Sequence, residues 1–212
     1  AGYRLSYPDE KLFTFYLDEF ETKLFDLPEG VYTCLIENEA CEEQILTPGM
    51  DDEIFSRTKV PMTKNEVRLL SISRLELTKN AVVYDVGSGT GSVSAECARL
   101  SPDIFVFAIE QKEEAANLTK ENAVRLGLSD QIVVINKKAP EGFEELPTPT
   151  HVFIGGSSGA LSDILSAIQK KLIVKENTKG KTDKASKGVR VVINAVSLET
   201  IAQITKLIQT YP

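Results

Sequence analysis

The chain has 212 residues, of which 42% are hydrophobic, and carries a formal net charge of -7 at pH 7. This length allows one full hydrophobic core with an additional segment, and the acidic balance argues against nucleic acid as a partner, because phosphate contacts need clustered lysine and arginine. No apolar run is long enough to span a bilayer and no signal peptide is recognisable, so we expect a cytoplasmic protein without a membrane partner.

The first predicted elements lie before residue 80. Residues 1–45 contain a helical pattern and an extended one, and one interpretation is a simple N-terminal extension. The main domain is predicted to occupy residues 46–212. Its first helix follows Pro61, where Thr63 and Glu66 have the spacing of a capping box, and is predicted to run to about Leu75.

The most informative stretch reads V-V-Y-D-V-G-S-G-T-G over residues 82–91, an apolar strand followed by a glycine turn. Glycine takes positive φ readily and lets backbone N–H groups approach a ligand, and the helix that follows directs its positive end toward the same place. This pattern predicts a nucleotide-type cofactor site, although a tight strand-to-helix turn without a ligand is the alternative. The candidate residues here are Asp85, Gly87, Ser88, Gly89, Thr90 and Gly91.

The identity of the nucleotide stays ambiguous at this level. Ser92 stands where the dinucleotide fingerprint requires its third glycine. The next strand ends in Glu110, followed by Gln111, and a carboxylate there can accept hydrogen bonds from both ribose hydroxyls. NAD and S-adenosylmethionine both fit such a carboxylate.

Apolar strand-like runs alternate with helical patterns along the rest of the chain, which predicts an α/β fold with a doubly wound, mostly parallel sheet. One helix is expected from about Glu113 to Gly127, and apolar residues at helical spacing predict two more, over 161–172 and 198–208. The strands are expected at 82–86, 105–109, 132–135, 151–154 and 189–194.

Ligands of such sheets bind beyond the carboxyl ends of the strands. This rule brings the glycine turn and Glu110 together with Ala139 after the third strand, Gly155 after the fourth and Asn194 after the fifth. The fourth strand is followed by G-G-S-S-G, which should offer free N–H donors and the hydroxyls of Ser157 and Ser158 to a carboxylate-bearing substrate.

Other reactive side chains are interpreted as structural. The three cysteines are odd in number and lack metal-ligand spacing, so we expect free thiols and no metal, with Cys97 packed on a helix. His151, the single histidine, begins an apolar strand away from the glycine turn. The basic residues between Lys170 and Arg190 predict either a solvated loop or a patch for an anionic ligand, and the loop is favoured.

Five segments together carry a resemblance to a known family, the decarboxylating precorrin methyltransferases of cobalamin biosynthesis. They read L-T-P-G-M-D-D-E-I-F, K-V-P-M-T-K-N-E-V-R, Y-D-V-G-S-G-T-G-S-V-S, V-F-I-G-G-S-S-G and V-I-N-A-V-S-L-E-T. The resemblance covers residues 46–212. It implies the class I S-adenosylmethionine-dependent methyltransferase fold, methylation of carbon 15 of the macrocycle and removal of the carboxyl group of the acetate on carbon 12.

The resemblance also implies roles for single residues. Residues Gly87 to Gly91 would form the S-adenosylmethionine pocket with Glu110 on the ribose, Met62 and Thr63 over the methionine end and Ala139 at the adenine. Asn194, Ser157 and Ser158 would orient the substrate, and no catalytic group is identified. The sequence departs from the family at Lys138, where an acid is usual, and at Thr150 and His151, where an acid often opens the strand.

The two ends of the chain carry further expectations. L-S-Y-P-D-E-K-L and V-Y-T-C-L-I-E resemble the end of the neighbouring methyltransferase that acts on carbon 5, so residues 1–45 are either its tail or a simple extension. The fold class usually finishes with two antiparallel strands, which this sequence is expected to lack, and the family implies a tetramer. Three alternatives stay open: a methyltransferase for another small molecule, a non-catalytic module that binds the cofactor or a tetrapyrrole, and an NAD-dependent oxidoreductase.

Overall fold

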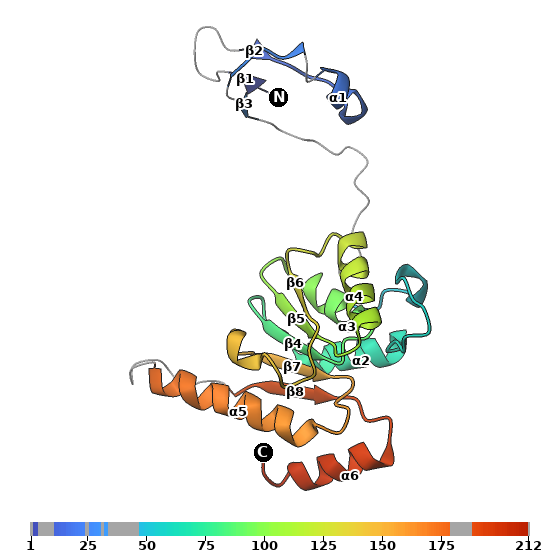
Figure 1. Cartoon of the computed structure of the whole chain (residues 1–212), viewed down its shortest axis with the longest axis vertical. Helices are drawn as coiled ribbons and strands as arrows, with labels where there is room; N and C mark the ends of the chain where they lie inside the picture. Colours follow the sequence, from blue (N-terminus) through green and yellow to red (C-terminus); the bar gives the residue numbers. More distant parts are fainter. Residues whose placement is uncertain are drawn as a thin grey trace. The chain divides into compact units, whose positions relative to one another are not determined.

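A computed structural model of the chain describes residues 2–3, 11–23, 26–30, 32–33, 47–178 and 188–211. The chain divides into two compact units, Ala1–Gln44 and Ile45–Pro212, both drawn in Figure 1. The lysine-rich segment 170–190, predicted as a loop, is helical up to Thr178, where α5 (Leu161–Thr178) ends, and Arg190 begins a strand, so the prediction is wrong for these residues. Residues 179–187 of this segment lie outside the described residues, as do Cys34 and Cys41.

The smaller unit contains a sheet of three two-residue strands and a short helical stretch. Strands β1 (Gly2–Tyr3), β2 (Lys11–Leu12) and β3 (Tyr32–Thr33) are antiparallel in the order β2-β1-β3. The 3-10 helix η1 (Leu17–Glu19) leads into α1 (Phe20–Lys23). The Glu19 carboxylate accepts a hydrogen bond of 3.1 Å from the Tyr16 N–H, which satisfies a backbone donor just before this stretch.

The larger unit is built on a five-stranded parallel sheet. Its strands lie in the order β6-β5-β4-β7-β8, and every neighbouring pair is parallel. The predicted α/β fold class is confirmed, and the predicted strands match within one residue at each end. The strands are β4 (Val82–Val86), β5 (Phe105–Ile109), β6 (Ile132–Ile135), β7 (His151–Ile154) and β8 (Arg190–Ile193).

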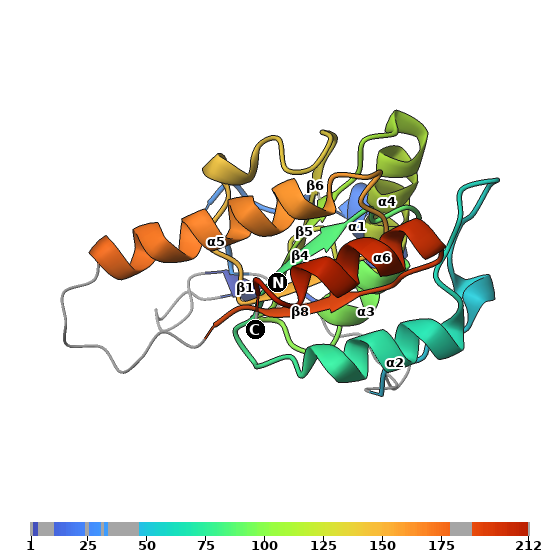
Figure 2. The same ribbon diagram turned by 90° about the horizontal axis from the view of Figure 1, so that it is seen from below.

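Helices cover both faces of this sheet, as Figures 1 and 2 show. Successive strand residues point to opposite faces. Val83 accordingly packs in a core cluster with residues of α2 (Asn65–Leu75), α3 (Ser92–Ala98) and α4 (Glu113–Arg125). Tyr84 packs in a second cluster, which joins the sheet to α5 (Leu161–Thr178) and α6 (Leu198–Leu207). Two 3-10 helices, η3 (Asp52–Ile54) and η4 (Phe143–Glu145), complete the unit.

The predicted capping box at the start of α2 is wrong. Lys64 is the N-cap residue and makes no side-chain cap, and its carbonyl accepts the first helical hydrogen bond, at 2.8 Å from the Arg68 N–H. The Thr63 carbonyl instead accepts a hydrogen bond of 2.8 Å from the Arg68 guanidinium. A tertiary contact therefore satisfies the backbone before the helix, in place of the local motif. The prediction for α4 is confirmed, since it ends at Arg125 and Gly127 follows with a φ of +67°.

The register of the sheet aligns the carboxyl ends of all five strands. Val86 pairs with Ile109 on one side and with Ile154 on the other. Ile109 pairs in turn with Ile135, and Ile154 pairs with Ile193. The last residues of the strands thus form one row, and the five loops that follow them open at the same edge of the sheet.

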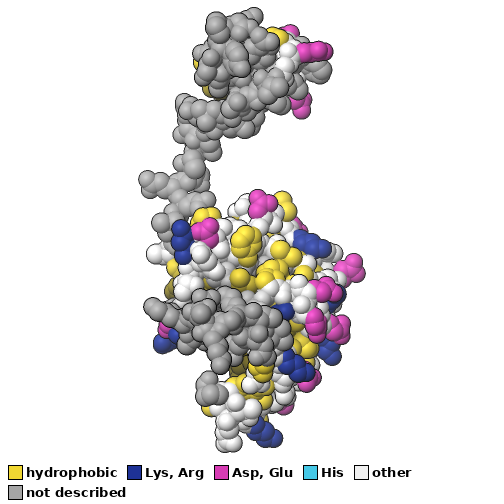
Figure 3. Space-filling view, turned by 90° about the vertical axis from the view of Figure 1, so that its left-hand side faces the viewer, with side chains coloured by type: hydrophobic (Ala, Val, Ile, Leu, Met, Phe, Trp, Pro, Cys, Tyr) yellow, Lys and Arg dark blue, Asp and Glu magenta, His cyan; other side chains and the backbone are white. Residues whose placement is uncertain are grey.

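The surface of the larger unit exposes several large hydrophobic side chains. Val67 and Leu70 on α2 are 48% and 57% exposed, and Val196 after β8 is 93% exposed. On the face in Figure 3, hydrophobic side chains gather in a patch with acidic and basic ones along its margin. Within the part of the chain that the structure describes, the helices are too short or too polar to cross a membrane.

Candidate functional site

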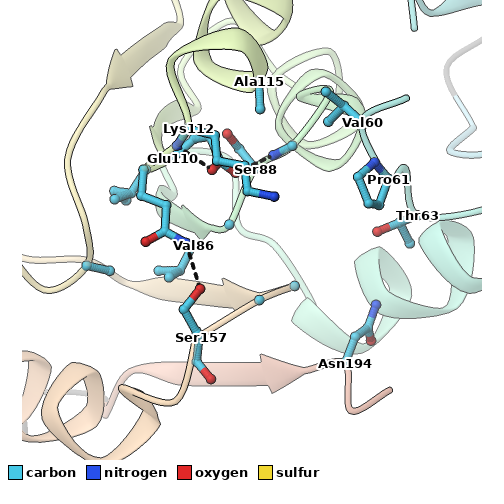
Figure 4. A pocket seen from close by; sticks show the side chains of 18 of the residues that line it. Val60, Pro61, Thr63, Val86, Ser88, Glu110, Lys112, Ala115, Ser157 and Asn194 are labelled. Atoms are coloured by element: carbon cyan, nitrogen blue, oxygen red, sulfur yellow. Dashed lines mark hydrogen bonds between the residues drawn. The ribbon is translucent and has the colours of Figure 1, made fainter. Parts of the chain in front are cut away.

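A cavity of about 760 Å³ opens at the carboxyl ends of the strands. It is lined by the loops that follow all five strands of the larger sheet, by residues 60–64 just before α2 and by Val67 in its first turn. The strand order reverses between β4 and β7, which is where α/β sheets bind their ligands. The volume of the cavity is in the range of small-molecule sites. Figure 4 shows Val60, Pro61 and Thr63 along one side, with Glu110 and Lys112 across from them.

Most of the residues predicted for the site meet in this one cavity. Those that line it are Met62, Thr63, Gly87, Ser88, Gly89, Glu110, Gln111, Ala139, Gly155, Ser157, Ser158 and Asn194. Three others are buried and do not belong to the lining: Asp85 in β4, and Thr90 and Gly91 at the end of the glycine turn. The sequence reasoning did not single out the lining residues Val60, Lys64, Val67, Lys112 and Lys137.

The three glycines of the turn are required by protein contacts. Gly87, Gly89 and Gly91 have φ values of +75°, +59° and +75°. A Cβ on Gly87 would lie 2.7 Å from the carbonyl oxygen of Gly156, and one on Gly91 would lie 2.7 Å from Cγ2 of Thr119. At these two positions, neighbouring protein occupies the space that the sequence analysis assigned to a ligand.

Glu110 presents a fixed carboxylate at the cavity. Its Oε2 accepts a hydrogen bond of 3.1 Å from the Gly89 N–H and its Oε1 accepts one of 2.9 Å from the Lys112 N–H, as drawn in Figure 4. The residue is only 8% exposed. Each carboxylate oxygen keeps a free lone pair, because a carboxylate offers about four acceptor sites. The side chain is therefore positioned in advance to accept further hydrogen bonds from a ligand.

Asp85 is completely buried under the turn and organises helix α3. The Ser94 hydroxyl donates to its Oδ2 at 2.5 Å, while Oδ1 has no partner among the described residues. The pKa of Asp85 is raised to about 6, mainly by burial and in smaller part by the negative charge of Glu110, while the Ser94 hydrogen bonds oppose the shift. Because Asp85 does not line the cavity, its carboxyl affects the site only through the position of the backbone that carries it.

The raised pKa makes a testable contribution to stability. Because the pKa of Asp85 is about 6 in the folded chain and near its ordinary value of 3.8 in the unfolded chain, stability should fall as pH rises through this window. A shift of this size corresponds to roughly 3 kcal/mol. We expect Asp85→Asn, which mimics the neutral acid, to be about 2 to 3 kcal/mol more stable relative to wild type at pH 7 than at pH 4 in urea denaturation. Parallel pH profiles of the two proteins would contradict this assignment.

The second glycine-rich turn differs in part from the prediction. The N–H groups of Gly155 and Gly156, expected to be free, both bond the Val86 carbonyl, at 2.9 and 3.3 Å. Ser158 has a φ of +47°, and its hydroxyl accepts a hydrogen bond of 2.7 Å from Gln111 Nε2. This bond joins the loop after β5 to the loop after β7 at the cavity.

Asn194 lies at the end of β8, near Thr63 in Figure 4. Its side-chain amide is held in place by α2, since Ser71 Oγ on that helix lies 3.1 Å from Asn194 Oδ1. Its backbone N–H donates to the Ile154 carbonyl at 3.0 Å. Asn194 also lines the cavity, so it lies where the predicted role in orienting a substrate requires it.

Basic side chains outnumber acidic ones along the cavity. Lys64 pairs with Asp52 at 3.3 Å, and Lys137 lies 3.9 Å from Glu145. Lys138, the departure from the family pattern, is exposed. The lining contains Lys64, Lys112, Lys137 and Lys138 against Glu110. This acidic protein therefore offers a locally positive cavity, which favours an anionic ligand.

His151 and Cys97 lie away from the cavity lining. The ring of His151 sits at the amino end of β7 with Nδ1 2.8 Å from Thr150 Oγ1, and burial lowers its pKa. Cys97 is a buried free thiol whose pKa is raised by burial. Among the residues that the structure describes, no group of three or more His, Cys, Asp or Glu side chains could hold a metal ion.

The sequence reasoning also missed a buried ionic cluster behind the cavity, formed by Arg68, Glu96 and Asp52. A signal for it was present in the spacing. Arg68 shares one face of α2 with the buried residues Ile72 and Leu75, so a charged residue stands where the helical period predicts an apolar one.

Comparisons with known proteins, by sequence and by structure, lead to enzymes named for precorrins. Residues 53–211 match the family described as the precorrin methyltransferase domain. The chain is 40% identical, over 73% of its own length and 73% of the relative's, to a protein of Pyrobaculum calidifontis named probable cobalt-precorrin-6B C(15)-methyltransferase (decarboxylating).

Two solved structures resemble the chain at 32% identity. One is the precorrin-6y C5,15-methyltransferase from Geobacter metallireducens, with a TM-score of 0.66 over 77% of this chain and 78% of that one. The other is the precorrin 8W decarboxylase from Methanobacterium thermoautotrophicum, with a TM-score of 0.64 over 76% of this chain and 80% of that one.

Proposed function

The chain belongs to the family of precorrin methyltransferase domains, and from this premise we propose that it transfers a methyl group from S-adenosylmethionine to carbon 15 of a precorrin. We also propose that it removes the carboxyl group of the acetate on carbon 12, since the name of the Pyrobaculum calidifontis relative includes a decarboxylation. The observation that carries the proposal is the cavity at the switch point of the sheet, in which the glycine turn meets the fixed carboxylate of Glu110.

The residues present fit this cofactor. The lone pairs of Glu110 that face the cavity suit the two ribose hydroxyls, and the half-buried Ala139 suits the adenine. Met62 and Thr63 line the cavity, with Thr63 across from Glu110 in Figure 4, and both would cover the methionine end. When bound, S-adenosylmethionine supplies an electrophilic methyl group. The protein's share is to hold that group and the acceptor carbon in line and to exclude water, which supplies much of the rate without a base.

The substrate side of the cavity suits an anionic tetrapyrrole. Lysine side chains attract its carboxylates, and the donors of Asn194, Ser157 and Ser158 orient them. For decarboxylation, the electron pair left when CO₂ departs passes into the conjugated ring. The chain needs only to orient and desolvate the leaving carboxylate.

Three further predictions accompany this proposal without altering it. Residues 1–45 are the tail of a preceding methyltransferase domain or an extension of this one. The protein forms a homo-oligomer, a tetramer by family resemblance, and acts in the cytoplasm without nucleic acid as a partner.

Calorimetric titration with S-adenosylhomocysteine and, separately, with NAD tests the cofactor. We expect micromolar binding of S-adenosylhomocysteine and no binding of NAD. Binding of NAD alone would contradict the methyltransferase assignment and favour an oxidoreductase.

Turnover distinguishes the remaining alternatives. Incubation with a precorrin and methyl-labelled S-adenosylmethionine should yield a product that has gained one methyl group and lost one CO₂, measured by mass spectrometry. Cofactor binding without any turnover of precorrin would favour a binding module or a methyltransferase for another small molecule.

A further inference from the structure

Arg68 is a buried arginine around which a whole segment of chain is folded. Its side chain is 0% exposed. Nη1 donates to Asp52 Oδ1 at 3.0 Å and to the Thr63 carbonyl at 2.8 Å, and Nη2 donates to the Met50 carbonyl. The Phe55 ring lies under the guanidinium, 4.9 Å from Cζ. The partners from Met50 to Thr63 belong to one stretch before α2, so a single cation closes this loop.

Glu96 on α3 fixes Arg68 and the start of the same segment. Its Oε1 accepts from Arg68 Nε at 3.2 Å and from the N–H groups of Gly49 and Met50 at 2.9 and 2.6 Å. Its Oε2 lies 3.5 Å from Arg99 Nη1. Both buried charges are thus paired and hydrogen-bonded, as burial of ions requires.

The end of this segment forms one wall of the cavity. Val60, Pro61, Met62 and Thr63 all line it. The Pro61 carbonyl oxygen also stands 2.9 Å from the place that a Cβ on Gly89 would occupy, so the segment packs directly on the glycine turn.

We propose that Arg68 is a positioning residue for S-adenosylmethionine, which holds residues 49–63 in the place where they form the cofactor wall. The inference rests on the proposed function for the identity of the ligand, while the placement of the segment by Arg68 stands independently. Apolar residues can replace a buried ion pair without loss of stability. The donors of Arg68, however, reach chosen backbone carbonyls at both ends of the segment, which an apolar core could not do.

Asp52→Asn is the mildest variant that tests this role. It keeps the shape of the side chain and removes the charge that Arg68 and Lys64 share. Asp103→Asn is the matched control, because it makes the same chemical change in an exposed ion pair with Lys79. Hydrogen exchange of the amides of residues 49–63 and the affinity for S-adenosylhomocysteine are measured for both.

We expect Asp52→Asn to raise the exchange rates of these amides about tenfold and to weaken S-adenosylhomocysteine binding about fivefold, while Asp103→Asn changes neither. Saturating S-adenosylhomocysteine should restore protection in Asp52→Asn, since ligand and segment stabilise each other reciprocally. Equal exchange and equal affinity in the two variants would overturn the proposal.

A fluorescent reporter separates placement of the segment from global folding. The sequence contains no Trp, so Lys59→Trp places a single indole on an exposed position of the segment. In this background, Arg68→Met combined with Glu96→Gln removes both buried charges together. Lower indole anisotropy with unchanged far-UV circular dichroism is expected, and unchanged anisotropy would overturn the proposal. If the parent chain fails to bind S-adenosylhomocysteine, the proposed cofactor is wrong, yet exchange and anisotropy still decide the role of Arg68.

Discussion

Gly87→Ala is expected to lower the free energy of unfolding by about 3 kcal/mol or more. The new Cβ would meet the oxygen, nitrogen and Cα of Gly156 at 2.7, 2.8 and 3.0 Å, and all three are backbone atoms that no rotamer change can move. Alanine at this position would also have to keep a φ of +75°, which residues with a Cβ seldom adopt. The two glycine turns that form the cavity floor would have to separate. Urea denaturation measures the loss.

Two other glycines divide this effect into its parts. Gly127 has a φ of +67° with open space where a Cβ would lie, so Gly127→Ala should show the cost of backbone strain alone, about 1 kcal/mol. Gly156 has neither positive φ nor a neighbour within 4 Å of a Cβ, and Gly156→Ala should stay within about 0.5 kcal/mol of wild type. A Gly87→Ala protein as stable as Gly127→Ala would show that the turns do not pack as described.

Glu110→Ala is expected to weaken S-adenosylhomocysteine binding about 100-fold, close to 3 kcal/mol. The substitution removes both hydrogen bonds proposed for the ribose. It also frees the Gly89 and Lys112 N–H groups, which the carboxylate holds at 3.1 and 2.9 Å. Isothermal calorimetry measures the affinity directly.

Two further variants separate charge and position from the general loss of a side chain. Glu110→Gln retains one acceptor oxygen and should fall between wild type and Glu110→Ala. Glu113→Ala removes an exposed carboxylate from the first turn of α4 and should bind as wild type does. An affinity of Glu110→Ala within threefold of Glu113→Ala, about 0.7 kcal/mol, would refute the role of Glu110.

Local sequence patterns were sufficient to predict the fold. Short segments rich in β-branched and aromatic residues, such as 82–86 and 151–154, form buried strands of a parallel sheet because helices cover both of its faces. The glycine turn, Glu110 and Asn194 come together because each directly follows a strand, and a parallel sheet brings such residues to one edge. Both results follow from the hydrophobic periodicity of the segments and from the topology of a parallel sheet, and both can be predicted from a single sequence.

Features that depend on contacts between distant segments were not predicted. The N-cap of α2 is Lys64 because the Arg68 guanidinium reaches the Thr63 carbonyl, and no local motif indicates that bond. The N–H groups of Gly155 and Gly156 appear free in the sequence, yet the parallel pairing of β4 with β7 directs them to Val86. In both cases tertiary hydrogen bonds determine the local backbone.

The aligned row of strand ends has a consequence for redesign. Glu110 follows β5 and Asn194 follows β8, with β4 and β7 between them. Three strand spacings separate the two residues by about 14 Å, and substitutions farther apart than about 10 Å usually have additive effects. Because both residues line one cavity, this additivity is expected for each ligand measured alone: changes of substrate preference made around Asn194 should leave the cofactor affinity set around Glu110 unchanged when no substrate is present.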